Sequence, residues 1–399
     1  MPALDWEAVG THRWGPALAG LRADALDCLQ TTAALLADHA HGPGTHLALG
    51  RPWRFPARDA NGVVTVQVSP ADRLADATRL LGLRVEWSQD GLDGPSVRAR
   101  LADGGPLYVI ADAVNLPWLP YFGHARMPHS FLIEPDGERY LVVDAYHNDT
   151  EWGPARPGAW TLPRTTVDSI LADGVTGVAV HPTNRPPDVD RADVLADNAA
   201  NARSAAPAID AYTDRLRTHL ADPGVITDLV LDIWLLSRER ALHAAWLADD
   251  PAAGPVAVRA EAWQRLSTQS YLVSRRMRRG GPPNSTVVDD LARLLHDDIA
   301  LAVRLTEPSD EDSEVTAVVM AALGELLGLA ENTLRTTDTL RSLPGFSSFR
   351  LVEVIDSAEH RLGVRLPADL AADDLRDVAG LCRLFTSAKR RAPAVGAGS

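Results

Sequence analysis

The sequence predicts an α+β protein in which a mixed N-terminal domain is followed by helical regions. Two observations lead to this fold class. Strand-like runs are confined to residues 1–185, whereas 190–306 consists of long Ala-, Leu- and Arg-rich stretches with helical spacing. A separate small helical pattern covers 315–388, after the acidic segment 307–314. We therefore expect three domains, with 307–314 as a linker and 389–399 as a disordered tail.

The composition is typical of a folded protein of the cytoplasm. The 399 residues are 46% hydrophobic and 23% charged. No apolar run approaches the roughly 20 residues of a membrane-spanning helix, and the N-terminus lacks the pattern of a secretion signal. Two cysteines, Cys28 and Cys382, fit a reducing compartment. The net charge of −14 disfavours nucleic acid and anionic membranes as partners.

The first helix of interest is the segment DCLQTTAALLADHAHG, which begins at Asp27. Asp27 and Gln30 have the spacing of a capping box, in which the two side chains and backbone amides bond reciprocally. This pattern places Cys28 in the first turn, where the helix dipole lowers the pKa of a thiol. The preceding residues are also compatible with a helix, so Cys28 could instead lie mid-helix. A lone cysteine beside Leu and Ala is more often a buried apolar residue.

Five runs then have the residue types of β-strands. They are VVTVQV (63–68), PLYVIAD (106–112), HSFLIE (129–134), RYLVVDAY (139–146) and VTGVAV (175–180). Asp136-Gly137 is a strong two-residue turn signal between the third and fourth runs. With that turn, His129 lies directly opposite Asp144 on one face, where the carboxylate can orient the imidazole. A slip of one residue would separate them, and a purely structural cross-strand pair is the alternative.

The helical region 190–306 reads as four helices, with breaks at 222–224, 249–255 and 280–285. Ser285 is a candidate N-cap for the last of them. The basic run RRMRR, residues 275–279, is either a solvated helix end or a docking site for an acidic partner. The histidines near residue 40 lack the spacing of a zinc site, so we expect no metal.

The C-terminal region is a compact helical unit with an unusual share of the charge. Over 310–388 there are 14 acidic and 7 basic residues. The difference, a net charge of −7, is half of the net charge of the whole chain. We expect helices over 315–329, from Ser348 onward and over 373–385, with 331–346 as a loop.

This unit resembles acyl and peptidyl carrier proteins. The matching positions are Gly345, Ser348, Glu353 and the run Gly363-Val364-Arg365-Leu366-Pro367. The resemblance implies 4'-phosphopantetheine bound covalently to Ser348, at a helix N-terminus that favours an anion. It also implies a phosphopantetheinyl transferase as a partner. Ser347 and Phe349 stand where the family motif has Asp and Leu. The alternative is a carrier fold that no longer carries a cofactor.

The N-terminal region resembles the family of butirosin biosynthesis protein H. The order of Cys28, the segment PLYVIADAVNLPWLPY (106–121), His129 and Asp144 carries the resemblance. It implies a papain-like or C39-like domain, with Cys28 as nucleophile, His129 as base and Asp144 as the orienting acid. Position 22 is Arg22 where papain-like enzymes have an oxyanion-stabilising Gln, so the backbone N–H of Cys28 is the obvious donor. Asp112 also falls on a family-like position, without an assigned role.

Together, the two resemblances imply an acyltransferase of natural-product, for example antibiotic, biosynthesis. An acyl or aminoacyl group, held as a thioester on its own or a separate carrier, would pass through Cys28 to an amine or hydroxyl of a small molecule, and the helical region would frame the acceptor pocket. A thioesterase or cyclase using the same nucleophile is a second hypothesis. A non-catalytic module that docks carriers is a third, and a leader peptidase fits a fused carrier poorly.

Overall fold

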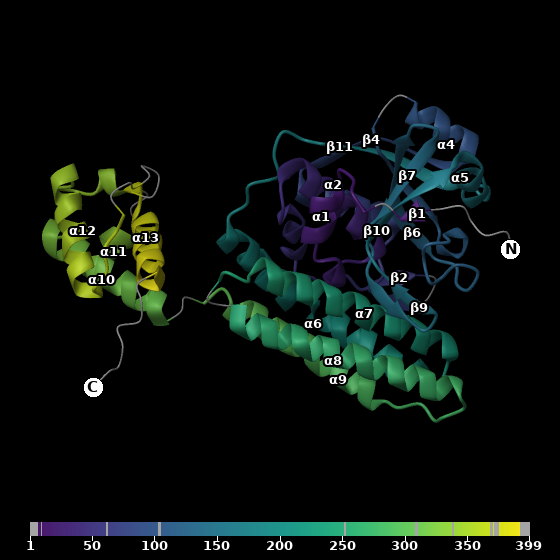
Figure 1. Cartoon of the computed structure of the whole chain (residues 1–399). Coiled ribbons are helices and arrows are strands. Elements are labelled where there is room, and N and C mark those ends of the chain that lie inside the picture. Colours follow the sequence, from purple (N-terminus) through teal and green to yellow (C-terminus); the bar gives the residue numbers. More distant parts are fainter. Residues whose placement is uncertain are drawn as a thin grey trace, which may run out of the picture. The chain divides into compact units, whose positions relative to one another are not determined.

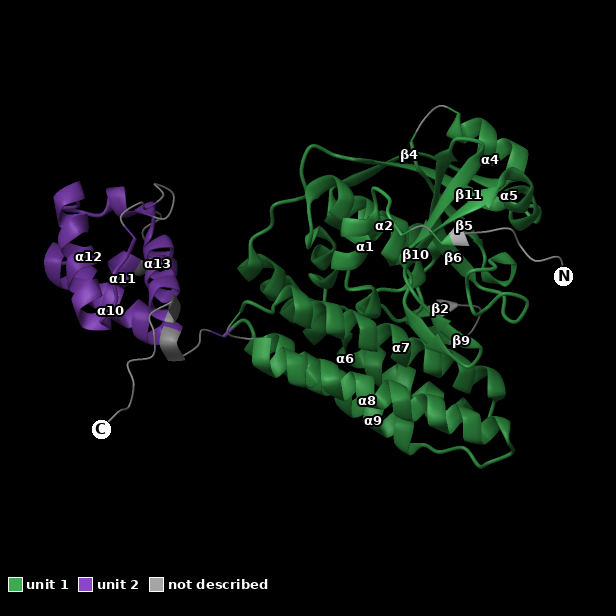
Figure 2. Ribbon diagram, in the orientation of Figure 1, with its two compact units in different colours: residues 1–306 green, residues 307–399 purple. Residues whose placement is uncertain are grey.

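The computed structural model describes residues 7–8, 10–60, 63–102, 105–250, 253–307, 310–336, 339–367, 370 and 375–391. The structure is mixed, with 58% helix and 15% strand, as expected for an α+β protein. It divides into two compact units, Met1–Thr306 and Glu307–Ser399 (Figure 2). Among the described residues, no helix has the length and apolar character needed to cross a membrane.

A seven-stranded antiparallel sheet organises the first unit, in the order β1-β10-β7-β6-β5-β11-β4 (Figure 1). The strands are β1 (Glu7–Ala8), β4 (Leu83–Leu92), β5 (Leu107–Asp112), β6 (Pro128–Asp136), β7 (Arg139–Asp144), β10 (Gly158–Pro163) and β11 (Val175–Pro182). Two small hairpins lie beside it, β2 (Arg58–Ala60) with β3 (Val63–Thr65) and β8 (Asn148–Thr150) with β9 (Gly153–Ala155).

Helices cover both faces of the sheet. On one face lie α1 (Gly15–Gly20), α2 (Cys28–His41) and α3 (Pro70–Leu81); on the other lie α4 (Gly94–Leu101) and α5 (Arg164–Ile170). Because side chains alternate along a strand, Leu132 of β6 packs into the first core and Phe131 into the second. His129 is two residues from Phe131 on β6, and Asp144 is two residues from Val142 on β7, so each shares the face of that neighbour. Both therefore lie on the face that α4 and α5 cover.

Four long helices complete the first unit, as the helical region predicted: α6 (Arg191–His219), α7 (Pro223–Trp246), α8 (Ala253–Arg278) and α9 (Thr286–Arg304). They do not form a compact unit of their own. The 3₁₀ helix η2 (Thr45–Gly50) lies so close to α7 that a Cβ at Gly50 would lie 2.5 Å from the Leu242 carbonyl oxygen. Ser285 occupies the N-cap position of α9 without a side-chain cap bond, because Asn284 Oδ1 accepts the Thr286 amide instead (3.0 Å).

The strand predictions were partly wrong. The run at 63–68 forms strand only over Val63–Thr65 and pairs with β2, not with the main sheet. The prediction missed β4, an edge strand whose side chains are mostly exposed and polar. It also missed β10, in which Gly158 and Pro163 obscure the strand pattern. Both strands form because they pair with strands that are distant in the sequence, β4 with β11 and β10 with β7, so their own residues do not predict them.

The hairpin β6–β7 has a different register from the predicted one. Asp136 pairs with Arg139, so the turn is Gly137–Glu138 and not Asp136-Gly137. Gly137 has φ +58°, a left-handed value that glycine adopts without strain and the first position of such a turn requires. The error is two residues along the partner strand. A two-residue shift preserves the face of each side chain, so His129 and Asp144 meet diagonally instead of directly opposite.

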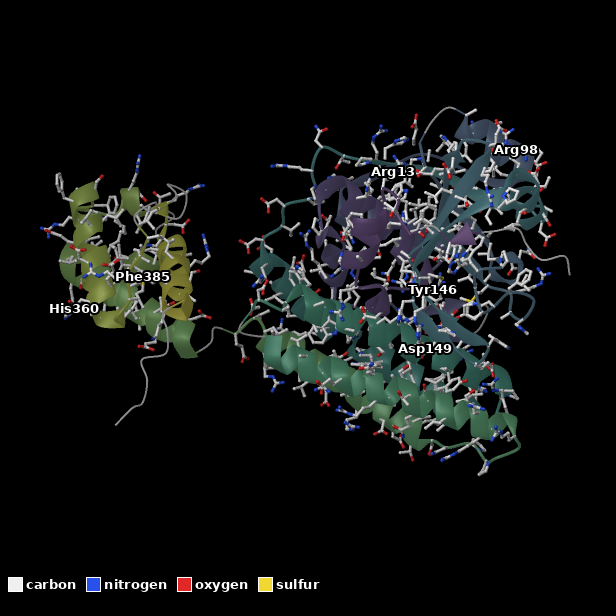
Figure 3. All side chains as sticks on the ribbon, viewed as in Figure 1. Arg13, Arg98, Tyr146, Asp149, His360 and Phe385 are labelled. Atoms are coloured by element: carbon white, nitrogen blue, oxygen red, sulfur yellow. The ribbon has the colours of Figure 1, made fainter. Side chains whose placement is uncertain are left out.

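The second unit is a small helical bundle. It contains α10 (Asp310–Leu327), α11 (Glu331–Arg335), the 3₁₀ helix η4 (Leu340–Ser342), α12 (Ser348–Leu362) and α13 (Val378–Arg391). Its core includes Phe385, which is fully buried among the helices (Figure 3).

The helices of this unit differ from the prediction in three places. The helix α10 begins at Asp310, inside the expected linker 307–314, since acidic residues are favourable in a first helical turn. The expected loop 331–346 contains α11 and η4. The helix α13 reaches Arg391 and Lys389 is ion-paired with Glu314, so the start of the expected tail is helical. Residues 392–399 lie outside the described residues.

Candidate functional site

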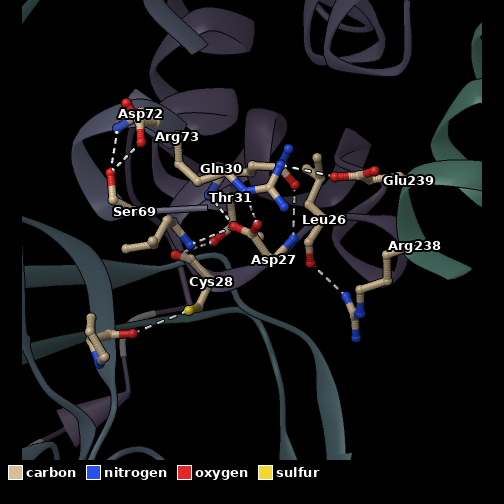
Figure 4. A network of polar contacts seen from close by, with 12 residues as sticks. Leu26, Asp27, Cys28, Gln30, Thr31, Ser69, Asp72, Arg73, Arg238 and Glu239 are labelled. Atoms are coloured by element: carbon tan, nitrogen blue, oxygen red, sulfur yellow. Dashed lines mark hydrogen bonds and ion pairs between the residues drawn. The ribbon is translucent and has the colours of Figure 1, made fainter. Parts of the chain in front are cut away.

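Cys28 is the first residue of α2, and the predicted capping box is confirmed (Figure 4). Asp27 Oδ1 accepts the amides of Leu29 (2.9 Å) and Gln30 (2.8 Å), and Gln30 Oε1 accepts the Asp27 amide (3.1 Å). These bonds fix the point at which the extended backbone at Asp27 gives way to the helix, so that α2 begins at Cys28. Cys28 therefore lies at a helix N-terminus and not in the middle of a helix.

Strand β6 is bound to this helix end on both sides of His129. Cys28 Sγ donates to the carbonyl oxygen of Pro128 at 3.4 Å, and Ser130 Oγ donates to the carbonyl oxygen of Cys28 at 2.6 Å. The Ser130 hydroxyl also lies 2.7 Å from Thr32 Oγ1. These contacts join residues about a hundred positions apart and bring Cys28 next to the strand that carries His129.

His129 is bonded to Asp144 through one ring nitrogen only. His129 Nε2 lies 2.7 Å from Asp144 Oδ2. Since an ionised carboxylate only accepts, Nε2 carries the proton in the neutral ring, and Nδ1 is left with a lone pair. Nδ1 is buried and has no hydrogen-bond partner among the residues that the structure describes. This tautomer gives His129 a free basic nitrogen.

Two further groups fix the Asp144 carboxylate. Trp118 Nε1 donates to Oδ2 at 2.8 Å, and the Tyr146 amide donates to Oδ1 at 2.9 Å. The Tyr146 ring also meets the His129 ring edge to face, with 5.1 Å between centroids. His129 is 0% exposed and Asp144 1%, so the pair lies away from solvent. Three donors on one buried carboxylate hold the imidazole in a single orientation.

The environment of Cys28 raises the pKa of its thiol, contrary to the prediction from the helix dipole. Burial is the main cause, because the residue is only 7% exposed. The negative charges of Asp27 and Asp144 act in the same direction, and the positive charge of Arg238 opposes them. Cys28 is therefore a thiol, not a thiolate, at neutral pH, and needs a base to become a nucleophile.

Other residues singled out in the sequence have structural partners. Asp112 accepts the amides of Val114 and Met127 and an Arg126 guanidinium bond, which fixes the loop leading to β6. Arg22 pairs with Asp24. Within the described part of the chain, no group of three or more His, Cys, Asp and Glu side chains is arranged to hold a metal ion.

The sequence analysis missed four residues of this site: Trp118, Ser130, Tyr146 and Arg238. Trp118, Ser130 and Tyr146 lie within segments that the sequence analysis noted as strand-like or family-like, but nothing in their local pattern shows that they face the Asp144 carboxylate or the start of α2. Arg238 comes from α7, more than 200 residues from Cys28, and no local pattern distinguishes it.

Ser348 is the exposed first residue of α12. Ser347 is the N-cap, and its Oγ accepts the Arg350 amide at 3.2 Å, which is the bond that the motif's Asp would make. The first turn of α12 contains no acidic residue. A phosphodiester on Ser348 would therefore meet free amides and the positive end of the helix dipole, with no carboxylate beside it in that turn. The site fits the cofactor.

Comparison with known families identifies this second unit. Residues 317–385 match the family described as phosphopantetheine attachment site. The C-terminal unit is therefore a carrier protein domain, the kind of domain to which 4'-phosphopantetheine is covalently attached. Such a domain requires a phosphopantetheinyl transferase and carries its substrate as a thioester, as in natural-product biosynthesis. No curated protein matches the chain.

Proposed function

We propose that this protein is an acyltransferase of natural-product biosynthesis that moves a carrier-bound acyl or aminoacyl group through Cys28 to an amine or hydroxyl acceptor. One observation carries the proposal: a cysteine at a helix N-terminus is hydrogen-bonded to the strand residues on both sides of a buried histidine, whose one nitrogen is held by a carboxylate and whose other nitrogen is free. A carrier domain in the same chain supports a thioester as the acyl donor.

In the first half-reaction, His129 Nδ1 takes the proton of Cys28 Sγ. The sulfur attacks the carbonyl carbon of the donor thioester, a new C–S bond forms, and the C–S bond to the donor thiol breaks. His129 then returns the proton to the departing sulfur. When attached, 4'-phosphopantetheine supplies the thiol on which the acyl group is held. Exchange of one thioester for another is nearly thermoneutral, so orientation and proton transfer are what the protein must provide.

In the second half-reaction, His129 Nδ1 takes a proton from the acceptor as its nitrogen or oxygen attacks the acyl group on Cys28. The bond to Cys28 breaks, and His129 reprotonates the sulfur. Asp144 stabilises the imidazolium in both steps. The Cys28 amide is the candidate oxyanion donor, because the Asp27 cap occupies the Leu29 and Gln30 amides and leaves it free of that bond.

Burial of the site favours transfer over hydrolysis. Cys28 is 7% exposed and His129 is fully buried, so bulk water has little access to an acyl group on the sulfur. A thioesterase or cyclase would release a free acid or a ring from the same intermediate. The mass of the product separates these outcomes.

The acyl-enzyme itself is the direct test. The full-length protein is incubated with an acyl thioester of a carrier protein and no acceptor, then digested for peptide mass mapping. We expect the acyl group on the peptide that contains Cys28, and its loss when an amine acceptor is added. An acyl group found only on the carrier, with the Cys28 peptide unmodified at all times, would refute the proposal.

Asp144→Asn is expected to slow acylation of Cys28 by about a hundredfold or more. The amide preserves the size of the side chain but removes the charge that stabilises the imidazolium, and it can also accept or donate to Nε2 and so permit the wrong tautomer. The rate of acyl-Cys28 formation is measured by mass spectrometry, with thermal unfolding as a control for folding. Acylation at the full rate in a folded variant would show that Asp144 has only a structural role.

A further inference from the structure

Arg238 of α7 is a buried cation that joins two loops of the candidate site. Its Nη1 donates to the carbonyl oxygens of Ala23 (2.9 Å) and Leu26 (2.6 Å), and its Nη2 donates to that of His147 (2.6 Å). The bond to Leu26 is visible in Figure 4. One loop leads into Cys28 and the other follows Asp144, so a single guanidinium fixes the approach to both residues.

The acceptors of Arg238 are all uncharged. Besides the three carbonyls, Nη2 lies 3.4 Å from Asn148 Oδ1, and the guanidinium lies 4.2 Å from the centre of the Trp234 ring. No carboxylate among the described residues forms an ion pair with it, although the side chain is only 9% exposed. Burying an unpaired charge is unfavourable, and loops can be held by neutral donors at lower cost.

The neighbouring buried arginines differ in this respect. Arg240, two residues along α7, lies 2.9 Å from Asp298. Arg73 lies 3.0 Å from both Asp27 and Glu239, so it compensates the helix cap beside Cys28 (Figure 4). Arg238 alone of the three has a positive charge that is not neutralised by a paired acid. That charge remains available to another anion.

Five ionisable groups interact with the Cys28 thiol: Asp27, Tyr108 of β5, Asp144, Tyr146 and Arg238. Asp24 of η1 (Ala23–Ala25) faces Arg238, and His129 is bonded to Asp144. The acids disfavour a thiolate, and Arg238 is the fixed cation that opposes them. Because an arginine side chain stays protonated at neutral and mildly alkaline pH, Arg238 is a permanent charge.

We propose that Arg238 is a positioning residue for Cys28, which holds the two loops at the thiol and supplies the buried positive charge that favours the thiolate. The proposal rests on the proposed function, in which Cys28 is the nucleophile. Arg238 belongs to α7, so one side chain of the helical region would act directly on the reactivity of Cys28.

The test measures thiol reactivity and not acyl transfer. In the full-length chain, Cys382→Ala and Ser348→Ala leave Cys28 as the one thiol and prevent cofactor attachment. Carbamidomethylation by iodoacetamide is followed by intact mass across neutral and mildly alkaline pH. In this background Arg238→Gln removes the charge, and Arg238→Lys keeps the charge but lacks the planar guanidinium with its several N–H donors. Arg240→Gln is the matched control on the same helix.

We expect Arg238→Gln to slow alkylation about tenfold at each pH and to displace the profile by about one unit to higher pH. Arg238→Lys is expected to remain within about threefold of the parent rate, and Arg240→Gln to leave the profile unchanged even where it lowers stability. Equal slowing in Arg238→Lys and Arg238→Gln, or an unchanged rate in Arg238→Gln, would overturn the proposal.

A second neutral variant, Arg238→Met, covers the case in which Arg238→Gln does not fold. If neither neutral variant folds, the guanidinium is structural and the proposal is also overturned. A failure of the proposed function is seen separately, because alkylation of Cys28 does not depend on whether the chain transfers acyl groups.

Discussion

Cys28→Ala is expected to lower the rate of acyl transfer from a carrier thioester by at least about 10⁴-fold. The variant retains the Asp27 cap, because the capping bonds use the side chains of Asp27 and Gln30 and not that of Cys28. It also retains the bond between His129 and Asp144. The loss therefore reports the missing nucleophile and not a disrupted site. Product formation is measured by mass spectrometry with an amine acceptor present.

The other cysteine supplies the matched control. Cys382 lies in the carrier domain, packed against its core, and the Cys382→Ala variant is expected to transfer acyl groups at close to the parent rate. Both variants are first loaded with cofactor, to show that the carrier is intact. Undiminished transfer by Cys28→Ala would exclude covalent catalysis by this residue and would favour the hypothesis of a non-catalytic docking module.

The electrostatics of the site determine how such a nucleophile would be generated. Because burial and nearby acids raise the pKa of Cys28, the thiolate is scarce at neutral pH and its fraction rises tenfold with each pH unit below that pKa. Reactivity must therefore increase with pH, unless a base removes the proton at the moment of attack. The unpartnered Nδ1 of His129 is suited to that task. The proposed mechanism thus needs the histidine as a base and not only as a counter-ion.

Local sequence was sufficient to predict the start of α2. The capping box depends on four consecutive positions, Asp27 to Gln30, and on side chains that bond the backbone within them, so the local pattern contains the whole interaction. The same holds for α12, where Ser347 caps a helix that begins at Ser348, as the motif required. In both cases the residue of chemical interest lies next to the cap.

The hairpin shows how a wrong register can still bring the right residues together. The turn signal Asp136-Gly137 was misassigned by one position, because the positive φ of Gly137 suits the first turn residue as well as the second. The first strand therefore ends one residue later than predicted, and the second strand begins one residue later. The two errors add to an even number, and the alternation of the strand preserves the common face of His129 and Asp144. A one-residue error would have separated them.

Tertiary contacts account for what the sequence did not reveal. The Trp118 indole that donates to Asp144 and the guanidinium of Arg238 reach the site from other segments, at separations of 26 residues for the bond from Trp118 to Asp144 and 212 for the bond from Arg238 to Leu26. The raised pKa of Cys28 has the same origin, since burial results from the packing of distant elements. A helix dipole is a local property and was overestimated for that reason.

Ser348→Ala is expected to abolish the covalent attachment of 4'-phosphopantetheine. Ser348 is exposed at the first position of α12, in the domain that matches the phosphopantetheine attachment family, and alanine has no hydroxyl to accept the phosphodiester. The intact mass is measured after incubation with coenzyme A and a broad-specificity phosphopantetheinyl transferase. The parent chain is expected to gain one cofactor and the variant none.

Ser347→Ala is the matched control for that experiment, because it changes the adjacent serine and removes only the cap bond to the Arg350 amide. Loss of an N-cap costs about 1 kcal/mol, so this variant is expected to be less stable but still modified. Modification of Ser348→Ala together with its loss in Ser347→Ala would move the attachment site to Ser347. A parent chain that gains no mass would mean that Phe349, which is 86% exposed where the motif has Leu, prevents recognition by the transferase. The acyl donor for Cys28 would then have to come from a separate carrier.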